Sequence, residues 1–109
     1  MNPNTWSVNE LVIVTRGGCA NTPVMQANLE TALRTLGLPV GFHLVDLDLL
    51  AGTDVLTGYP TPTLLFRGRD VFGMPKPKPL FPEPALRIYP DGVPSAAAIA
   101  RQLRVVLSL

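Results

Sequence analysis

The sequence has few cysteines, histidines and charged residues, and it lacks the features typical of membrane, secreted and nucleic-acid-binding proteins. Its 109 residues include one cysteine, one histidine and 16% charged residues, with a net charge of +1. Lys and Arg are scattered singly, which argues against nucleic acid as a partner. No apolar run approaches the roughly 20 residues of a membrane-spanning helix, and the amino terminus lacks the charged start and apolar stretch of a secretory signal. We therefore expect a cytoplasmic protein that binds neither nucleic acid nor membrane.

The first half of the chain predicts a β-α-β unit. Residues 10–15 (ELVIVT) form a β-branched apolar run, which is typical of a strand buried on both faces. A helix is expected from a Thr22 cap and Pro23 to about residue 36, since its apolar residues recur at spacings of three and four. Residues 41–46 then read as a second strand, parallel to the first. The apolar face of this helix holds Met25, Leu29, Ala32, Leu33 and Leu36.

The middle of the chain predicts a short helix and a hairpin. Residues 48–56 favour a short helix capped by Asp48, although Gly52 weakens it. Residues 63–66 and 71–72 are apolar segments on either side of a polar turn, which is typical of an antiparallel hairpin. This hairpin would extend the same sheet.

The last third of the chain predicts a proline-rich segment and a final helix. Residues 73–94 hold seven of the twelve prolines, which indicates a long ordered loop or a lid. Ser95 caps a helix to about Val106 that buries Ile99, Leu103 and Val106. The predicted fold class is α/β: one domain over residues 1–109, with a four-stranded mixed sheet and helices on both faces.

Cys19 is the residue with the clearest chemical potential. A lone cysteine cannot form an internal disulfide, which leaves burial, metal ligation or reactivity as its role. It follows a buried strand and precedes a helix start, where backbone N–H groups and the helix dipole favour a thiolate. Gly17 and Gly18 would let a partner's backbone approach the sulfur closely. The alternative is a tight turn that contains a partly buried structural cysteine.

Two segments together resemble the thioredoxin and glutaredoxin superfamily. They are the C-x-x-T segment of residues 19–22, at the head of the first helix, and the TPTLLF segment of residues 61–66, before the hairpin. The resemblance extends over residues 10–106 and implies a thioredoxin-like fold. It also implies that Pro62 is cis and lies beside Cys19, and that Thr61 offers backbone hydrogen bonds to an extended substrate.

The resemblance further implies roles for Arg16 and Thr22. Arg16 stands where many glutaredoxins carry a lysine that binds a carboxylate of glutathione, and a guanidinium could make a bidentate contact there. The alternative for Arg16 is an ordinary exposed arginine at a strand end. Thr22 replaces the second cysteine of the dithiol motif and would donate a hydrogen bond to the thiolate. The Gly-Gly-x-Asp segment of glutaredoxins is replaced by residues 73–76 (GMPK).

Without a resolving thiol, a mixed disulfide at Cys19 cannot be released internally. We therefore favour monothiol thiol-disulfide exchange that an external thiol completes. Cys19 and Thr22 would be the catalytic residues, and a protein disulfide or a glutathione-type thiol the partner. The alternatives are a non-catalytic binding module that keeps the groove beside Pro62, and an iron-sulfur cluster carrier that uses glutathione. No resident cofactor or metal site is expected.

Three other polar features have simpler interpretations. His43 lies within a predicted strand and is interpreted as a strand-face residue rather than a catalytic partner of Cys19. Asp46 and Asp48 lack the further ligands of a metal site, so a strand end and a helix cap explain them. Arg87 and Tyr89 could reach over the sulfur, but packing against the sheet edge is the favoured role of Tyr89.

Overall fold

A computed structural model describes residues 10–17, 19–51, 54–74, 87 and 93–108. Within these residues the four strands form one mixed sheet in the order β2-β1-β3-β4. The chain is therefore α/β, and its β-α-β unit, hairpin and final helix follow one another as predicted. The elements are β1 (Leu11–Thr15), α1 (Thr22–Thr35), β2 (His43–Asp46), the 3-10 helices η3 (Leu47–Leu49) and η4 (Val55–Gly58), β3 (Thr63–Phe66), β4 (Arg69–Asp70) and α2 (Ala96–Val106).

Strand β1 lies at the centre of the sheet. It pairs in parallel with β2, where Thr15 is opposite Asp46, and antiparallel with β3, where Val14 is opposite Thr63. Ile13 and Val14 point to opposite faces and are both fully buried. A strand flanked on both edges and covered on both faces requires the continuous apolar run that the sequence shows.

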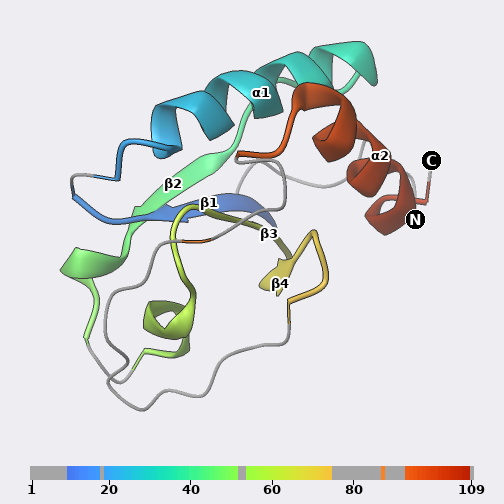
Figure 1. Ribbon diagram of the computed structural model, residues 1–109. Helices are drawn as coiled ribbons and strands as arrows, with labels where there is room; N and C mark the ends of the chain where they lie inside the picture. The colour runs from blue at the N-terminus through green and yellow to red at the C-terminus, as the bar shows by residue number, and fades with distance from the viewer. Residues whose placement is uncertain (1–9, 18, 52–53, 75–86, 88–92, 109) are drawn as a thin grey trace.

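The two faces of the sheet are covered by different elements. Helices α1 and α2 lie together over the face that carries Leu11, Ile13 and Leu64, as Figure 1 shows. On the opposite face, Val14 and Leu65 pack with Leu47, Tyr59 and neighbouring side chains around η3 and η4. The expectation of helices on both faces is corrected accordingly: both described α-helices cover one face, and 3-10 helices cover the other.

Helix α1 starts one residue earlier than its predicted cap implies. Thr22 is its first helical residue, and Asn21 takes the N-cap position without a side-chain hydrogen bond. The end of α1 follows the sequence, because Gly37 has a φ of 69°. The N–H of Gly37 donates to the carbonyl of Arg34 and the N–H of Leu38 to that of Leu33, at 3.0 and 2.9 Å. This pair of bonds closes the helix in the manner typical of a glycine terminus.

Two predicted elements in the middle of the chain were wrong in detail. The helix expected over residues 48–56 is instead two 3-10 helices, because the side chains of Asp46 and Asp54 each accept a backbone N–H and start a new turn. The second hairpin strand is Arg69–Asp70 rather than residues 71–72. Arg67 and Gly68 both have positive φ, 52° and 80°, and so form a two-residue turn. Strand β4 therefore starts earlier in the sequence than expected, at Arg69.

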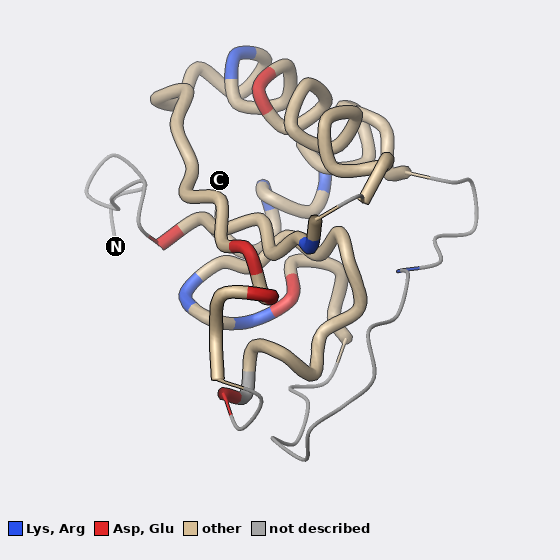
Figure 2. Tube along the Cα trace, turned by 90° about the vertical axis from the view of Figure 1, so that its left-hand side faces the viewer, with Lys and Arg blue, Asp and Glu red and all other residues tan. Residues whose placement is uncertain are grey.

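Helix α2 forms as predicted, with one change on its buried face. The N–H of Ala98 donates to the Ser95 hydroxyl at 3.1 Å, and the helix ends at Val106. Val106 is exposed, whereas Leu107 is buried, one turn after Leu103. Most of the proline-rich residues 73–94 lie outside the described residues. Charges of both signs are spread along the trace (Figure 2), and no described helix is long and apolar enough to cross a membrane.

Replacing Leu103 with alanine should destabilise the protein by about 2–5 kcal/mol, because the side chain is fully buried where α2 closes the core. The matched control is Val105→Ala on the same helix, where the side chain is 70% exposed and the change should stay within about 0.5 kcal/mol. Urea unfolding measures both. Equal losses of stability would contradict the packing of α2 described above.

Candidate functional site

Cys19 lies in the connection between the end of β1 and the start of α1. Its backbone N–H donates to the carbonyl of Arg16 at 3.1 Å, and its own carbonyl accepts from the N–H of Thr22 at 3.3 Å. The side chain is neither buried nor fully exposed. The thiol is therefore fixed at the carboxyl end of the central strand, where solvent and a small reactant can reach it. Gly18 lies outside the described residues.

Thr61 and Pro62 come to the same end of the sheet from a distant part of the chain. They precede β3, which runs antiparallel to β1 and places Thr63 opposite Val14. Both residues are buried, and the peptide bond between them is cis, which is the isomer that the resemblance implies. The hydroxyl of Thr61 donates a hydrogen bond to the sulfur of Cys19. The two segments singled out in the sequence therefore meet at one thiol.

The surroundings of Cys19 favour its charged form. Burial acts to raise the pKa of the thiol, but hydrogen bonds to the sulfur outweigh it. These come from the side chains of Thr22 and Thr61 and from the backbone N–H groups of Asn21 and Thr22. The net result is a Cys19 pKa below its ordinary value. The two N–H groups are those left without intrahelical partners at the start of α1.

The hydroxyl of Thr15 contacts the hydroxyl of Thr22. The Oγ1 atoms of Thr15 and Thr22 are 2.7 Å apart, and both residues are buried. A hydroxyl has one proton to donate. When Thr22 donates its proton to the sulfur, the hydrogen of the 2.7 Å bond must come from Thr15. Either hydroxyl can be the donor in the 2.7 Å bond, and Thr15 Oγ1 also lies 3.4 Å from the carbonyl of Arg16, which is a second acceptor for its proton. The end of β1 thus supplies a hydroxyl that can donate to Thr22 when Thr22 donates to the sulfur.

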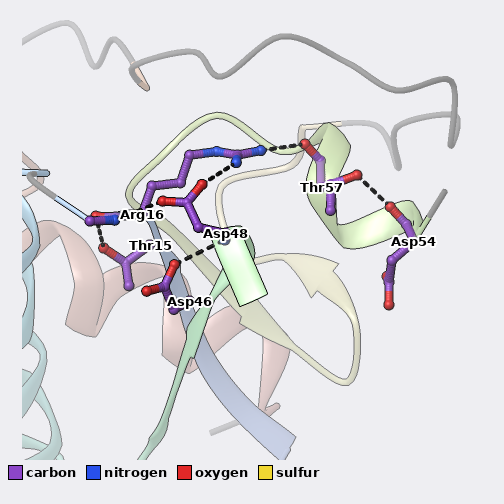
Figure 3. A network of polar contacts seen from close by, with 7 residues as sticks. Thr15, Arg16, Asp46, Asp48, Asp54 and Thr57 are labelled. Carbon is purple, nitrogen blue, oxygen red and sulfur yellow. Dashed lines mark hydrogen bonds and ion pairs between the residues drawn. The ribbon is translucent and has the colours of Figure 1, made fainter. Parts of the chain in front are cut away.

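The guanidinium of Arg16 points toward Asp48 and Thr57, as Figure 3 shows. Its Nη1 lies 2.7 Å from Oδ1 of Asp48, and its Nη2 donates to the carbonyl of Thr57 at 3.1 Å. The N–H of Gly17 donates to the other carboxylate oxygen at 3.1 Å. Hydrogen bonds from Arg16 and Gly17 hold the pKa of Asp48 below its ordinary value. The carboxylate that Arg16 binds here is internal.

This arrangement contradicts the interpretation of Arg16 as an ordinary exposed arginine, whereas its contact with a glutathione carboxylate stays a prediction. The side chain is only 14% exposed, so it is not an ordinary surface arginine. It braces the loop that carries Cys19 against η3 and η4. Gly17 contributes its backbone N–H to this arrangement. A Cβ at this position would lie 3.7 Å from Asp48 Oδ2, which is an ordinary contact distance. Asp48 ties this loop to the segment after β2, and Asp46, not Asp48, caps η3.

Sequence reasoning missed a buried ion pair on the other side of Thr61. Arg87 Nη2 lies 2.9 Å from Oδ2 of Asp70, and the Asp70 side chain is fully buried. The backbone N–H of Arg87 donates to the carbonyl of Thr61 at 2.7 Å. Asp70 directly precedes an apolar pair, Val71 and Phe72, and an aspartate that is buried must find a cation; that was the available signal. Nothing in the spacing identified Arg87 as that cation.

His43 does not belong to the group around Cys19, and Tyr89 lies outside the described residues. His43 is exposed and pairs with Val12, toward the opposite end of β1 from Cys19. It is therefore a strand residue, as interpreted from the sequence. No three His, Cys, Asp or Glu side chains in the described part of the chain lie together in a way that could hold a metal ion.

Thr22→Val should raise the pKa of Cys19, because it removes a hydroxyl donor to the thiolate and keeps the branched shape of the side chain. The pH dependence of Cys19 alkylation measures this, and the rate curve of the variant should move to higher pH. Thr31→Val is the matched control, since the Thr31 hydroxyl on the exposed side of α1 donates only to the backbone of Ala27. Superimposable curves for all three proteins would contradict the role of Thr22.

The geometry thus brings Cys19, Thr22, Thr61 and Pro62 together, and directs Arg16 and Gly17 to Asp48. The chemistry available is that of a partly exposed thiol whose pKa is lowered by neutral hydrogen-bond donors. Comparisons with protein-family models, with curated proteins and with solved structures found no match.

Proposed function

We propose that this chain carries out monothiol thiol-disulfide exchange at Cys19. The observation that supports this most directly is the set of hydrogen bonds to the Cys19 sulfur, from Thr22, Thr61 and the first N–H groups of α1, which lowers the pKa of the thiol. Thiolates, not thiols, attack disulfides. A cysteine kept only for packing would need no such donors.

The reaction follows two balanced steps. In the first, the Cys19 thiolate attacks one sulfur of a disulfide, a new S–S bond forms to Cys19, and the other sulfur leaves as a thiolate with the electron pair of the broken bond. In the second, a small external thiolate attacks the mixed disulfide and releases Cys19 as a thiolate. The sum of the two steps releases one half of the substrate as a thiolate and leaves the other half in a mixed disulfide with the external thiol. A second external thiolate then attacks this small mixed disulfide in solution, so that one disulfide is reduced and two small thiols are oxidised. The external thiol is required because the chain has one cysteine.

Thr22 and Thr61 have defined roles in this scheme. Their hydroxyls stabilise the thiolate before attack and again when it is released from the mixed disulfide. Thr61 precedes Pro62 and the start of β3, and its hydroxyl lies beside the sulfur. Because the reaction consumes free thiol, we propose that the protein works in a reducing compartment such as the cytoplasm.

The proposal includes a thioredoxin-like fold. It is supported by the element order of a β-α-β unit, a hairpin and a final helix, and by the strand order β2-β1-β3-β4. It is also supported by the meeting of the residue 19–22 segment with the residue 61–62 segment at one thiol. The fold alone does not choose a function, so the proposal depends on the site.

A lowered pKa by itself is expected to raise the exchange rate only modestly. Each unit by which a thiol pKa falls toward ambient pH raises the thiolate fraction about tenfold, but lowers the intrinsic nucleophilicity about threefold. The net gain from the pKa alone is therefore about threefold per unit. A larger gain would mean that the folded protein also positions the disulfide.

The test uses a hydroxyethyl disulfide substrate with a small thiol as reductant. At neutral pH, folded Cys19 should exchange several-fold faster than the same thiol in the urea-unfolded chain, and Cys19→Ser should fall to the background of the reductant. The Thr31→Val variant, altered on the exposed side of α1, should match the natural chain.

A folded Cys19 no faster than the unfolded thiol would contradict the proposal. Partner capture from the same protein that survives Cys19→Ala would then favour the non-catalytic binding module.

A further inference from the structure

Thr61 is bonded on two sides. Its hydroxyl donates to the sulfur of Cys19, and its carbonyl accepts the backbone N–H of Arg87 at 2.7 Å. Arg87 comes from a distant part of the chain, yet its backbone lies against the residue that adjoins the thiol. The backbone acceptor beside the reactive sulfur is therefore already engaged by the protein itself.

The Arg87 side chain anchors this contact. Its guanidinium lies 2.9 Å from Asp70 Oδ2, with Asp70 fully buried and Arg87 10% exposed. The same group donates to the hydroxyl of Thr63 at 3.3 Å and to the sulfur of Met74 at 3.4 Å. A buried pair of this kind is costly to separate, because either partner alone would be left charged and desolvated.

Asp70 in turn is fixed by the backbone that follows β4. Its Oδ1 accepts the N–H of Phe72 at 3.0 Å, and its Oδ2 accepts the N–H of Met74 at 2.9 Å. The carboxylate therefore holds one position, and the Arg87 guanidinium is directed to it. The backbone N–H of Arg87 is placed at Thr61 by a chain of contacts that begins in the hairpin.

This placement bears on which disulfides can approach Cys19. An extended polypeptide gains affinity by pairing its backbone with an open strand edge. At Thr61, the carbonyl that such a strand would use accepts from Arg87 instead. A compact disulfide needs no backbone partner, and Cys19 is partly exposed.

We propose that Arg87 determines the specificity of this site: its backbone fills the pairing position at Thr61, so that compact disulfides react with Cys19 in preference to extended polypeptides. The inference rests on the proposed exchange at Cys19 and names the substrate class of that same reaction. Arg87 acts by occupying the place of a substrate backbone and takes no part in the bond changes.

The experiment compares two disulfides that share a leaving thiol. One is hydroxyethyl disulfide, and the other is an unstructured uncharged peptide whose cysteine carries a mercaptoethanol cap. The ratio of the two exchange rates is measured for folded Cys19 and for the urea-unfolded chain, which serves as the unhindered reference. The folded protein should disfavour the peptide by about tenfold relative to that reference, the scale of one peptide hydrogen bond.

A double variant, Asp70→Asn with Arg87→Ala, removes the anchor without leaving a buried charge unpaired. It should raise the peptide rate by about tenfold and leave the hydroxyethyl disulfide rate within about twofold. Arg104→Ala, at an exposed position of α2, is the control and should change neither rate. Circular dichroism shows whether each variant is folded. If the double variant is not, the rate ratio of the natural chain decides alone.

The outcomes separate this inference from the proposed function. If folded Cys19 reacts with neither disulfide faster than the unfolded thiol does, both fail. If it reacts faster with both and disfavours neither, the exchange stands and the specificity of Arg87 is overturned. A folded double variant that keeps the preference of the natural chain also overturns it.

Discussion

The hydrogen bond between the hydroxyls of Thr15 and Thr22 joins the two elements on which the site depends. At 2.7 Å, and with both residues buried, it links the last residue of the central strand to the first residue of α1. An apolar pair could pack there, but it could not direct a proton toward the sulfur. The contact between β1 and α1 at Thr15 and Thr22 therefore bears both on where Cys19 lies and on the hydrogen bond that Thr22 donates to its sulfur.

Charge in this region is balanced within the chain. Arg16 is paired with Asp48 and Arg87 with Asp70, so each of these cations near the thiol has an internal carboxylate. The groups that lower the pKa of Cys19 are neutral hydroxyls and backbone N–H groups. The two ion pairs have structural roles on either side: one braces the loop before α1, and the other fixes a backbone against Thr61.

Much of the framework could be predicted from local patterns, because these depend on nearby residues. The apolar run of β1, the spacing in α1 and the Ser95 cap of α2 all express short-range rules. The hairpin turn was predicted, but its shortness was missed, because a two-residue turn here needs positive φ at Arg67, a residue other than glycine. The 3-10 helices were missed because aspartate side chains restarted the turns.

The site was predictable only in part, because local patterns report on residues that are close in sequence. Cys19, Thr22 and Thr61 could be singled out by motif. The partners of Arg16 and Asp70 are 32 and 17 residues away in sequence, and side-chain pairing at such separations leaves no periodic signal. Arg16 therefore read as a ligand-binding or surface residue, whereas burial and a nearby carboxylate made it part of the framework.

The central claim is that the fold itself lowers the pKa of Cys19. The most direct measurement is a pH titration of the thiolate ultraviolet absorbance in the folded protein and in the same chain unfolded in urea, with Cys19→Ser subtracted as the blank. The unfolded thiol should titrate near the ordinary value of about 8.5, and the folded thiol at lower pH, because the hydrogen bonds to sulfur outweigh burial. A folded midpoint equal to or above the unfolded one would contradict the account.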